Sequence, residues 1–181
     1  MTLVSVANVV LSSATVVGHL GIGFLVAILL FRRKTALGYI GRNAIVLSFI
    51  IALSATLGSL FYSEIIGYEP CTLCWFQRIF MYPQVILLGM LLWKKRGAGI
   101  VDGSIILSII GTAIALYHHL LQIGLTPELP CSATGYSVSC AERFVMSFGY
   151  ITIPLMTFTA FVLIALLLGI SKIHEKSDTQ I

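Results

Sequence analysis

The residues in this sequence whose type and spacing can do chemistry are its four cysteines. Cys71 and Cys74 form a C-x-x-C pair, and Cys131 and Cys140 form a C-x8-C pair further along the chain. A C-x-x-C disulfide closes a very small ring, and such pairs often contain one thiol of lowered pKa, which makes them reactive. Two dithiols also suit an exchange relay, in which a thiolate attacks a disulfide and its neighbour resolves the mixed disulfide. The spacing therefore predicts redox chemistry, with plain structural bridges as the alternative.

The composition indicates what surrounds these cysteines. Of the 181 residues, 58% are hydrophobic and only 10% are charged, and the mean hydropathy is +1.01. An ordinary soluble domain has about 25% charged residues, and a soluble core cannot hide this much apolar surface. The chain is therefore predicted to be a membrane protein that forms one compact unit in the lipid bilayer.

Five apolar segments are long enough to cross a bilayer, which takes roughly 20 residues for about 30 Å of hydrocarbon. Lipid cannot satisfy an open backbone, and no barrel-like alternation is visible, so these segments are expected to be helices. The predicted fold class is an all-α polytopic membrane protein. The expected spans are Leu3 to Phe31, Ala44 to Tyr62, Leu73 to Trp93, Ser104 to Ile123, and Phe144 to Ile170.

The positions of the basic residues predict the orientation of the spans. Positive charge gathers on the cytoplasmic side of membrane proteins, and five crossings place the polar segments after spans one, three and five on one side. The N-terminus and both cysteine loops are then extracytoplasmic, and the C-terminus is cytoplasmic. Charge scattered over short connections argues against a nucleic-acid partner. Nine of the eleven Lys and Arg residues lie in these segments: Arg32, Arg33, Lys34, Arg42, Lys94, Lys95, Arg96, Lys172 and Lys176.

Arg78 lies inside the third predicted span, four residues after Cys74. This spacing puts both residues on one helix face, about 6 Å apart. A cation within the bilayer costs about 3 kcal/mol or more, so it is read as functional. It is suited to stabilise a Cys74 thiolate or negative charge on a bound acceptor, whereas snorkelling to the headgroups is the alternative. Gln77 is a weaker candidate for orienting hydrogen bonds, and nearby aromatic residues are candidates to flank a flat ring: Trp75, Phe76, Phe80 and Tyr82.

A relay that ends in thiols stops after one turnover, so it needs a terminal electron acceptor. In a bilayer the expected acceptor is a diffusible quinone, and the sequence leaves ubiquinone and menaquinone open. His118 and His119 close the fourth span at its outer end, and imidazole is suited to deliver protons near neutral pH. The two rings point about 100° apart, so at most one is expected to face inward. Interface positions are the alternative for both.

Three segments resemble the DsbB family of bacterial disulfide-forming membrane proteins. The sequence from Cys71 to Arg78, CTLCWFQR, is similar to the family's signature, and Tyr117 to Gln122, YHHLLQ, is similar to the end of its penultimate span. Cys140 to Arg143, CAER, looks like the segment that opens the last span. Together they cover roughly residues 44 to 170. The resemblance implies a four-helix bundle, here at residues 43–171, with one additional N-terminal helix at 1–42 and a cytoplasmic tail at 172–181.

The resemblance also implies roles for the site residues. The protein is expected to reoxidise a DsbA-like thioredoxin-fold partner, with the Cys131–Cys140 disulfide accepting the electrons and Cys131 as the sulfur attacked. The C-x-x-C pair then reoxidises that pair, and Cys74 faces the quinone. Arg78 matches the family's quinone-side arginine, and His119 matches its histidine by its place two residues after Tyr117. The chain departs from the family pattern in its added first span and its shorter second cysteine loop.

Three other interpretations were weighed against a protein-dithiol:quinone oxidoreductase. A vitamin K epoxide reductase type of enzyme is disfavoured because its loop cysteines precede the C-x-x-C pair, whereas here they follow it. A structural zinc site of four thiolates suits the C-x-x-C half, but an oxidising compartment disfavours free thiolates, and no metal is expected. A membrane scaffold with two disulfide staples leaves Arg78 unexplained.

Overall fold

The structure, a computed structural model, describes residues 3–31, 33–94, 97–127 and 139–178. These residues form an all-α bundle and contain no strand beyond one isolated bridge. All five α-helices are long and apolar enough to cross a membrane, so the predicted fold class of a multi-pass all-α membrane protein is confirmed. The elements in chain order are α1 (Leu3–Leu30), α2 (Lys34–Leu60), the π-helical turn η1 (Phe61–Ile65), α3 (Thr72–Lys94), α4 (Ala98–Gln122) and α5 (Ile153–Asp178).

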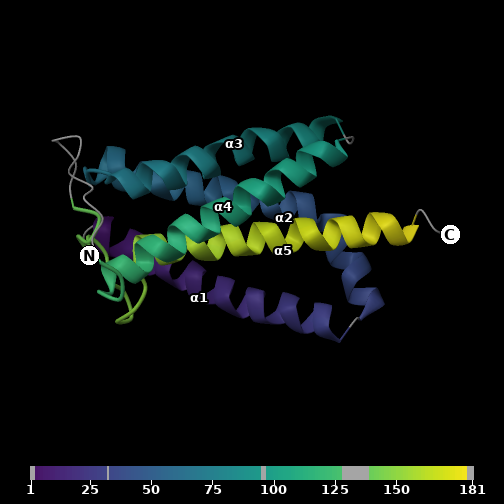
Figure 1. Ribbon diagram of the computed structural model, residues 1–181, viewed down its shortest axis with the longest axis horizontal. Coiled ribbons are helices and arrows are strands. Elements are labelled where there is room, and N and C mark those ends of the chain that lie inside the picture. The colour runs from purple at the N-terminus through teal and green to yellow at the C-terminus, as the bar shows by residue number, and fades with distance from the viewer. Residues whose placement is uncertain (1–2, 32, 95–96, 128–138, 179–181) are drawn as a thin grey trace.

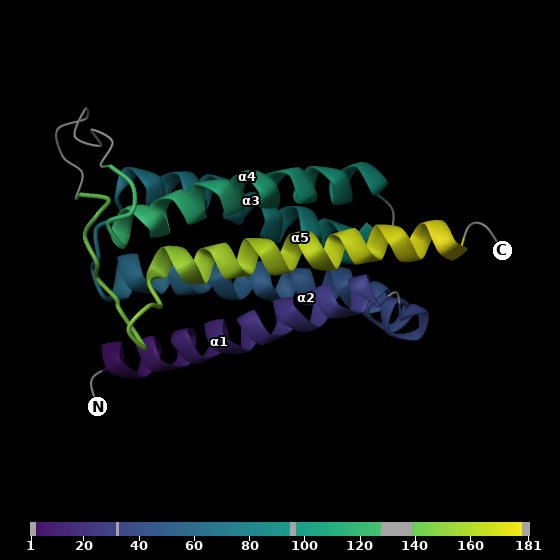
Figure 2. The same cartoon turned by 60° about the horizontal axis from the view of Figure 1, so that its bottom comes forward.

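Helix α5 is the centre of the bundle. It packs against α2, α4 and α1 (Figures 1 and 2), and its side chains Phe161, Ile164 and Leu168 are fully buried. Gly111 of α4 permits the closest approach, because a Cβ atom there would lie 2.3 Å from Cζ of Phe161. The outward faces carry exposed apolar side chains such as Ile86, as expected where lipid is the solvent.

Helix α1 packs on α5, on the side opposite α4 (Figures 1 and 2). Gly18 lets α1 approach α5 closely, because a Cβ there would meet Cγ2 of Thr159 at 2.7 Å. The His19 ring also lies 3.0 Å from the Thr159 hydroxyl through its Nε2 atom. A small residue and one interhelical hydrogen bond therefore seat α1 on α5.

The two ends of the bundle carry different parts of the chain. The N-terminus, the η1–α3 connection and the α4–α5 connection lie at one end, and the C-terminus lies at the other (Figure 1). The described parts of both cysteine-bearing segments therefore lie at the same end as the N-terminus, which is the arrangement that the predicted topology requires. Gly124, with φ of +81°, ends α4 here, and the Leu125 N–H donates to the Leu120 carbonyl oxygen, which closes the last turn.

The expected start of the fifth span at Phe144 was wrong: α5 begins nine residues later, at Ile153. The intervening segment turns at Phe148 and Gly149, whose φ values of 52° and 79° are incompatible with an α-helix. Ser147 and Ile151 close this turn by exchanging two 2.9 Å backbone hydrogen bonds. At the other end α5 continues to Asp178, and α2 and α4 begin earlier than expected, at Lys34 and Ala98. The division at residues 43 and 172 stays a prediction.

Candidate active site

The C-x-x-C pair sits at the first turn of α3. Cys71 immediately precedes the helix, and its Sγ atom lies 3.4 Å from the Cys74 N–H, in the position of an N-cap acceptor. The helix begins here because the Trp75 N–H also donates to the Cys71 carbonyl oxygen, at 3.1 Å. This turn brings the two sulfur atoms within 3.1 Å of each other, and the Cys71 thiol donates to the Cys74 sulfur. Local helix geometry therefore pre-sets the pair for disulfide formation.

The two cysteines differ in environment. Cys71 is only 3% exposed, whereas Cys74 is partly exposed. The hydrogen bond to Cys74, together with burial, raises the pKa of the Cys71 thiol to about 12, although the nearby His118 acts in the opposite direction. Cys71 is therefore the proton-holding member of the reduced pair.

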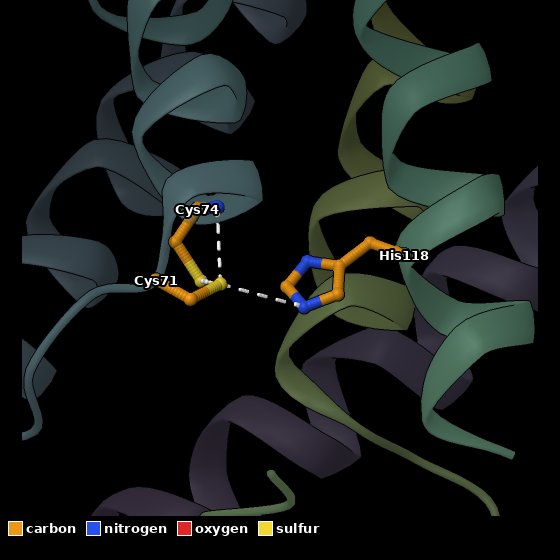
Figure 3. A group of neighbouring side chains, drawn as sticks. All are labelled: Cys71, Cys74 and His118. Atoms are coloured by element: carbon orange, nitrogen blue, oxygen red, sulfur yellow. Dashed lines mark hydrogen bonds between the residues drawn. The ribbon is translucent and has the colours of Figure 1, made fainter. Parts of the chain in front are cut away.

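His118 is the polar centre of the site. It comes from α4, is 1% exposed, and directs its Nε2 atom toward Cys71, 3.7 Å from that sulfur (Figure 3). The same Nε2 atom lies 3.0 Å from the Cys140 carbonyl oxygen, and Nδ1 lies 2.9 Å from the Gln77 amide nitrogen. The Gln77 amide donates to Nδ1, and the proton on Nε2 is donated to the carbonyl oxygen. The tautomer that results presents an N–H group to the Cys71 sulfur.

His119 points to a different part of the chain. Its Nδ1 atom lies 3.0 Å from the Thr152 hydroxyl, just before α5. The prediction that at most one of the two histidines faces inward is consistent with this arrangement: His118 reaches the cysteines and His119 does not. One turn further, the Gln122 amide donates to the Glu142 carbonyl oxygen at 2.8 Å. Helix α4 thus holds the returning segment through both residues.

Cys140 belongs to the same site as the C-x-x-C pair. It is 2% exposed and shares a buried cluster with Cys71 and Leu121, against which Cys74 packs. Cys140 is thereby brought next to Cys71 even though 69 positions separate them in the sequence. Cys131, the fourth predicted site cysteine, lies outside the described residues.

A cavity of about 320 Å³ opens beside Cys74. Its walls come from α1, α2, η1, α3 and α5, and they are apolar apart from a few groups that include Gln77 and Arg78. A much smaller pocket, of about 20 Å³, lies on the other side of Cys74 and is lined by Cys71 and His118. Cys74 and Phe144 are among the few residues that line both spaces. The volume and lining of the large cavity suit a small, mostly apolar ligand.

Arg78 lies one turn after Cys74 on the wall of the large cavity. Its Nε atom donates to the Ser59 hydroxyl at 3.0 Å, and Nη2 donates to the Ser59 carbonyl oxygen at 3.2 Å. Its guanidinium carbon is also 5.2 Å from the centroid of the Trp75 ring. The Tyr82 hydroxyl donates to Ser59 as well, at 3.4 Å. Arg78 is therefore fixed by contacts within the bundle.

The aromatic residues at the cavity are mostly not those expected. Of the four predicted to flank a flat ring, only Tyr82 lines the cavity, whereas Trp75 and Phe76 are exposed on the outer face. The aromatic wall is instead a stack of three rings: Tyr62 on Tyr68, with centroids 5.9 Å apart, and Tyr68 on Phe144, at 4.7 Å. These rings come from separate segments, so helical spacing gave no signal for them. Ser59 was not predicted either, because its contact with Arg78 joins two different helices.

The structure thus brings five predicted site residues to one end of a bundle of apolar helices, around a buried dithiol: Cys71, Cys74, Gln77, His118 and Cys140. Arg78 stands one turn away, and His119 bonds to Thr152 and not to the cysteines. A dithiol with a neighbouring imidazole and a third cysteine, set in a membrane bundle, defines a membrane protein of thiol–disulfide chemistry.

Comparison with known proteins agrees with this class. Residues 41–171 match the family model of the disulfide bond formation protein DsbB. The chain is 44% identical over 124 residues to a probable disulfide formation protein C of Halalkalibacterium halodurans, which covers 67% of this chain and 88% of that protein. It is 40% identical over 134 residues to disulfide bond formation protein C of Bacillus subtilis, covering 72% of this chain and 93% of that protein. No solved structure matches the chain significantly.

The chain therefore belongs to the DsbB family of disulfide bond formation proteins. The family resemblance predicted from the three short segments is confirmed, and with it the broad class of disulfide-forming oxidoreductase. The additional helix α1 lies outside the family match, which begins at residue 41.

Proposed function

We propose that this protein is a thiol oxidoreductase that reoxidises a DsbA-like thioredoxin-fold protein and passes the electrons to a membrane quinone. One observation carries the proposal: Cys74 stands between the pocket that holds Cys71 and His118 and the cavity that holds Arg78. A sulfur at this junction can belong to a disulfide on one side and face an electron acceptor on the other. The protein would then act as a relay that sustains disulfide bond formation.

The thiol side of the proposal balances as two exchanges. The partner's dithiol reduces the Cys131–Cys140 disulfide and leaves as a disulfide. The resulting dithiol then reduces the Cys71–Cys74 disulfide, with Cys140 exchanging with Cys71, its neighbour in the buried cluster. When Cys140 attacks Cys71, Cys74 leaves as a thiolate, and Cys131 then attacks Cys140 and releases Cys71. The His118 N–H beside Cys71 is suited to stabilise the Cys71 sulfur as it leaves with negative charge in this second step. His118 is favoured over His119 for this role because it contacts the cysteines.

The acceptor side depends on the large cavity. Its volume of about 320 Å³ lies within the usual range for a bound small molecule, and its apolar walls suit a flat ring with an apolar tail. Arg78 and Gln77 would hold the polar oxygens. When bound, the quinone supplies the acceptor for the two electrons and two protons that the Cys71 and Cys74 thiols give up on forming their disulfide. Arg78, held by Ser59, would favour negative charge next to Cys74.

The test uses the purified full-length protein in detergent or nanodiscs with a reduced thioredoxin-fold partner. Soluble ubiquinone and menaquinone analogues are supplied in separate assays, and their reduction is followed by absorbance. We expect one quinone to be reduced for each partner disulfide formed. No quinone reduction above the rate without protein, with either analogue, would overturn the quinone step, and quinone reduction that persists in Cys74→Ser would overturn the proposed route.

The proposal also sets the orientation. The cysteine end would be extracytoplasmic in a bacterial inner membrane, and the opposite end, where Arg33 and Lys172 lie, would be cytoplasmic. Reporter cysteines at two exposed positions test it: Glu64→Cys at the cysteine end and Gly99→Cys at the opposite end. A membrane-impermeant maleimide should label the first in intact cells and the second only after lysis. The reverse pattern would contradict the orientation.

A second candidate function is metal binding at the same cysteines. The ligand atoms of Cys71, Cys74 and His118 all lie within 4.8 Å of one another, as a metal site requires. It is the weaker candidate, because the His118 Nε2 proton is already directed at the Cys140 carbonyl oxygen. Elemental analysis separates the two: stoichiometric zinc with four cysteines that stay reduced would support the metal site and contradict the relay.

A further inference from the structure

Helix α1 supplies part of the wall of the large cavity, although it lies outside the part of the chain that matches the family. We propose that α1 is a ligand-contacting wall that encloses the quinone cavity between α2 and α5. This inference rests on the proposed function, since it names the bound molecule as a quinone with an apolar tail. Four α1 residues line the cavity, and their i, i+3, i+4, i+7 pattern puts them on one helix face: Leu11, Ala14, Thr15 and Gly18.

Two hydrogen bonds hold this face in place, one on each side of it. The Tyr62 hydroxyl donates to Oδ1 of Asn8 at 2.8 Å, one turn before the wall begins. The His19 Nε2 atom lies 3.0 Å from the Thr159 hydroxyl, directly after the wall ends. Tyr62 and Thr159 are themselves lining residues of the cavity. The contacts that position α1 are therefore made by the walls that α1 faces, which fixes the width of the cavity.

The residues of this face are suited to leave room for a ligand. Gly18 lets α1 approach α5 so closely that a Cβ would clash with Thr159 at 2.7 Å. Ala14 faces the cavity with a single methyl group and is exposed, so it does not bear on the packing of α1. Both views place α1 at the edge of the bundle, away from α4 (Figures 1 and 2). Without α1, this side of the cavity would open directly to lipid.

The Bacillus subtilis relative indicates that this wall is an addition to the shared bundle. The match covers 93% of that protein, so about 10 of its residues lie outside it, too few for a membrane span of roughly 20. A counterpart of α1, which has 28 residues, does not fit in that remainder. The enclosure by α1 would thus distinguish the quinone site of this chain from a site built by four helices.

The first test maps contacts directly. The full-length protein is photolabelled with an azido-quinone that carries a short isoprenoid tail, with and without excess unmodified quinone, and the labelled peptides are identified by mass spectrometry. We expect label within residues 11–18 as well as on α3, and we expect the unmodified quinone to compete with both. Competed label on α3 and α5, with none on α1, would overturn the inference and leave the proposed function standing.

The second test changes the wall. Ala14→Leu and Ala14→Phe add bulk into the cavity, and Ser13→Phe is the matched control, because Ser13 is exposed but does not line the cavity. The dissociation constant for the quinone should rise stepwise, about threefold for Ala14→Leu and more than tenfold for Ala14→Phe, and stay within twofold for Ser13→Phe. Equal affinity in all four proteins would overturn the inference.

One further measurement separates folding from binding. The single-turnover reaction of the oxidised protein with a reduced thioredoxin-fold partner needs no quinone, so it should proceed at the wild-type rate in the Ala14 variants. If Ala14→Phe loses this reaction as well, the milder Ala14→Leu decides: selective loss of quinone affinity supports the wall, and no such loss contradicts it. If the wild-type protein neither takes competed label nor reduces quinone, the proposed quinone function has failed, and the inference fails with it.

Discussion

The two spaces on either side of Cys74 are built differently. The smaller, of about 20 Å³, has no room for a ligand. Its wall includes His118, which contacts the Cys71 sulfur, the Cys140 carbonyl oxygen and the Gln77 amide. The larger, of about 320 Å³, is mostly apolar and places Arg78 on its wall. Tight polar packing suits exchange between protein sulfurs, which requires no added molecule. An apolar space with one fixed cation suits an acceptor from the membrane. Substitutions at residues that line only one space should therefore affect one side without the other, whereas Cys74 should affect both.

Cys74→Ser should have the largest effect, because this sulfur belongs to both spaces. Turnover from reduced partner to quinone should fall by about 1000-fold or more, since neither the Cys71–Cys74 disulfide nor its reoxidation is possible. The measurement is quinone reduction at saturating partner. Ser139→Ala, at an exposed position beside the small pocket, is the control and should stay close to wild type. Substantial turnover in Cys74→Ser would show that Cys74 does not link the two spaces.

His118→Ala should slow the thiol side alone. Removing the N–H beside the Cys71 sulfur should lower the rate of exchange between the Cys131–Cys140 pair and the Cys71–Cys74 pair by about 100-fold. The matched control is His119→Ala, which removes the same side chain one position away and should change that rate by less than about threefold, because His119 bonds to Thr152. Stopped-flow fluorescence of single-turnover exchange measures both. Equal losses in the two variants would mean that contact with the cysteines does not matter.

The same pair of variants tests which histidine has the functional role. The family resemblance favours His119 by its place after Tyr117, whereas the contacts favour His118. A larger loss in His119→Ala than in His118→Ala would restore the prediction from sequence. Thermal unfolding of both variants controls for stability, since His118→Ala also leaves the buried Gln77 amide without its partner, at a cost of about 1–3 kcal/mol.

Arg78→Gln should weaken the acceptor side alone. The KM for quinone should rise about 10- to 30-fold, because a neutral amide replaces the fixed cation on the cavity wall. Thiol exchange with the partner should stay within about twofold of wild type. Arg143→Gln, which removes an exposed cation at the same end of the molecule, should leave the KM for quinone unchanged. A slower thiol exchange in Arg78→Gln, with its KM unaltered, would reverse the assignment of the two spaces.

Much of this arrangement could be predicted from the sequence, because the signals were local. Five long apolar runs required helices, and the C-x-x-C spacing placed two thiols within one turn. The four-residue spacing of Cys74 and Arg78 placed both on the wall of one cavity. The choice between the adjacent histidines depended on the structure, since a rotation of about 100° separates their side chains.

The rest depended on contacts between distant segments. Ser59 holds Arg78 from another helix, and Phe144 completes an aromatic stack with Tyr62 and Tyr68. No periodicity within one segment indicates such a pairing. The fifth span was misplaced because hydropathy does not register a turn: Phe148 is apolar, yet its positive φ interrupts the helix. The contribution of α1 to the cavity could not be predicted, because α1 contains none of the cysteines and lies outside the family resemblance.

The smallest effect is expected in the pH dependence of Cys71 alkylation, which is measured without an activity assay. In the reduced protein its pKa is raised from 9.0 to about 12, chiefly by the hydrogen bond to Cys74 and then by burial. Because only the thiolate reacts with iodoacetamide, the rate constant for Cys71 alkylation should keep rising between pH 7 and 10 without levelling near 9. The burial of Cys71 slows alkylation at every pH but does not move the pH at which the rate levels off. In Cys74→Ala the main cause is removed, so the inflection should move to lower pH.

The raised pKa of Cys71 also makes the stability of the reduced protein depend on pH. The folded protein keeps a proton on Cys71 that the unfolded chain loses as pH rises through 9, so the stabilisation is fully present below pH 9 and is lost between 9 and 12. The reduced protein should therefore lose stability over this range more steeply than Cys74→Ala, as measured by chemical unfolding at successive pH values. An inflection near pH 9 in the alkylation of the wild-type protein would show that Cys71 holds its proton no more firmly than an ordinary thiol. Cys71 and Cys74 would then not differ in the way proposed for the small space, where Cys71 holds its proton.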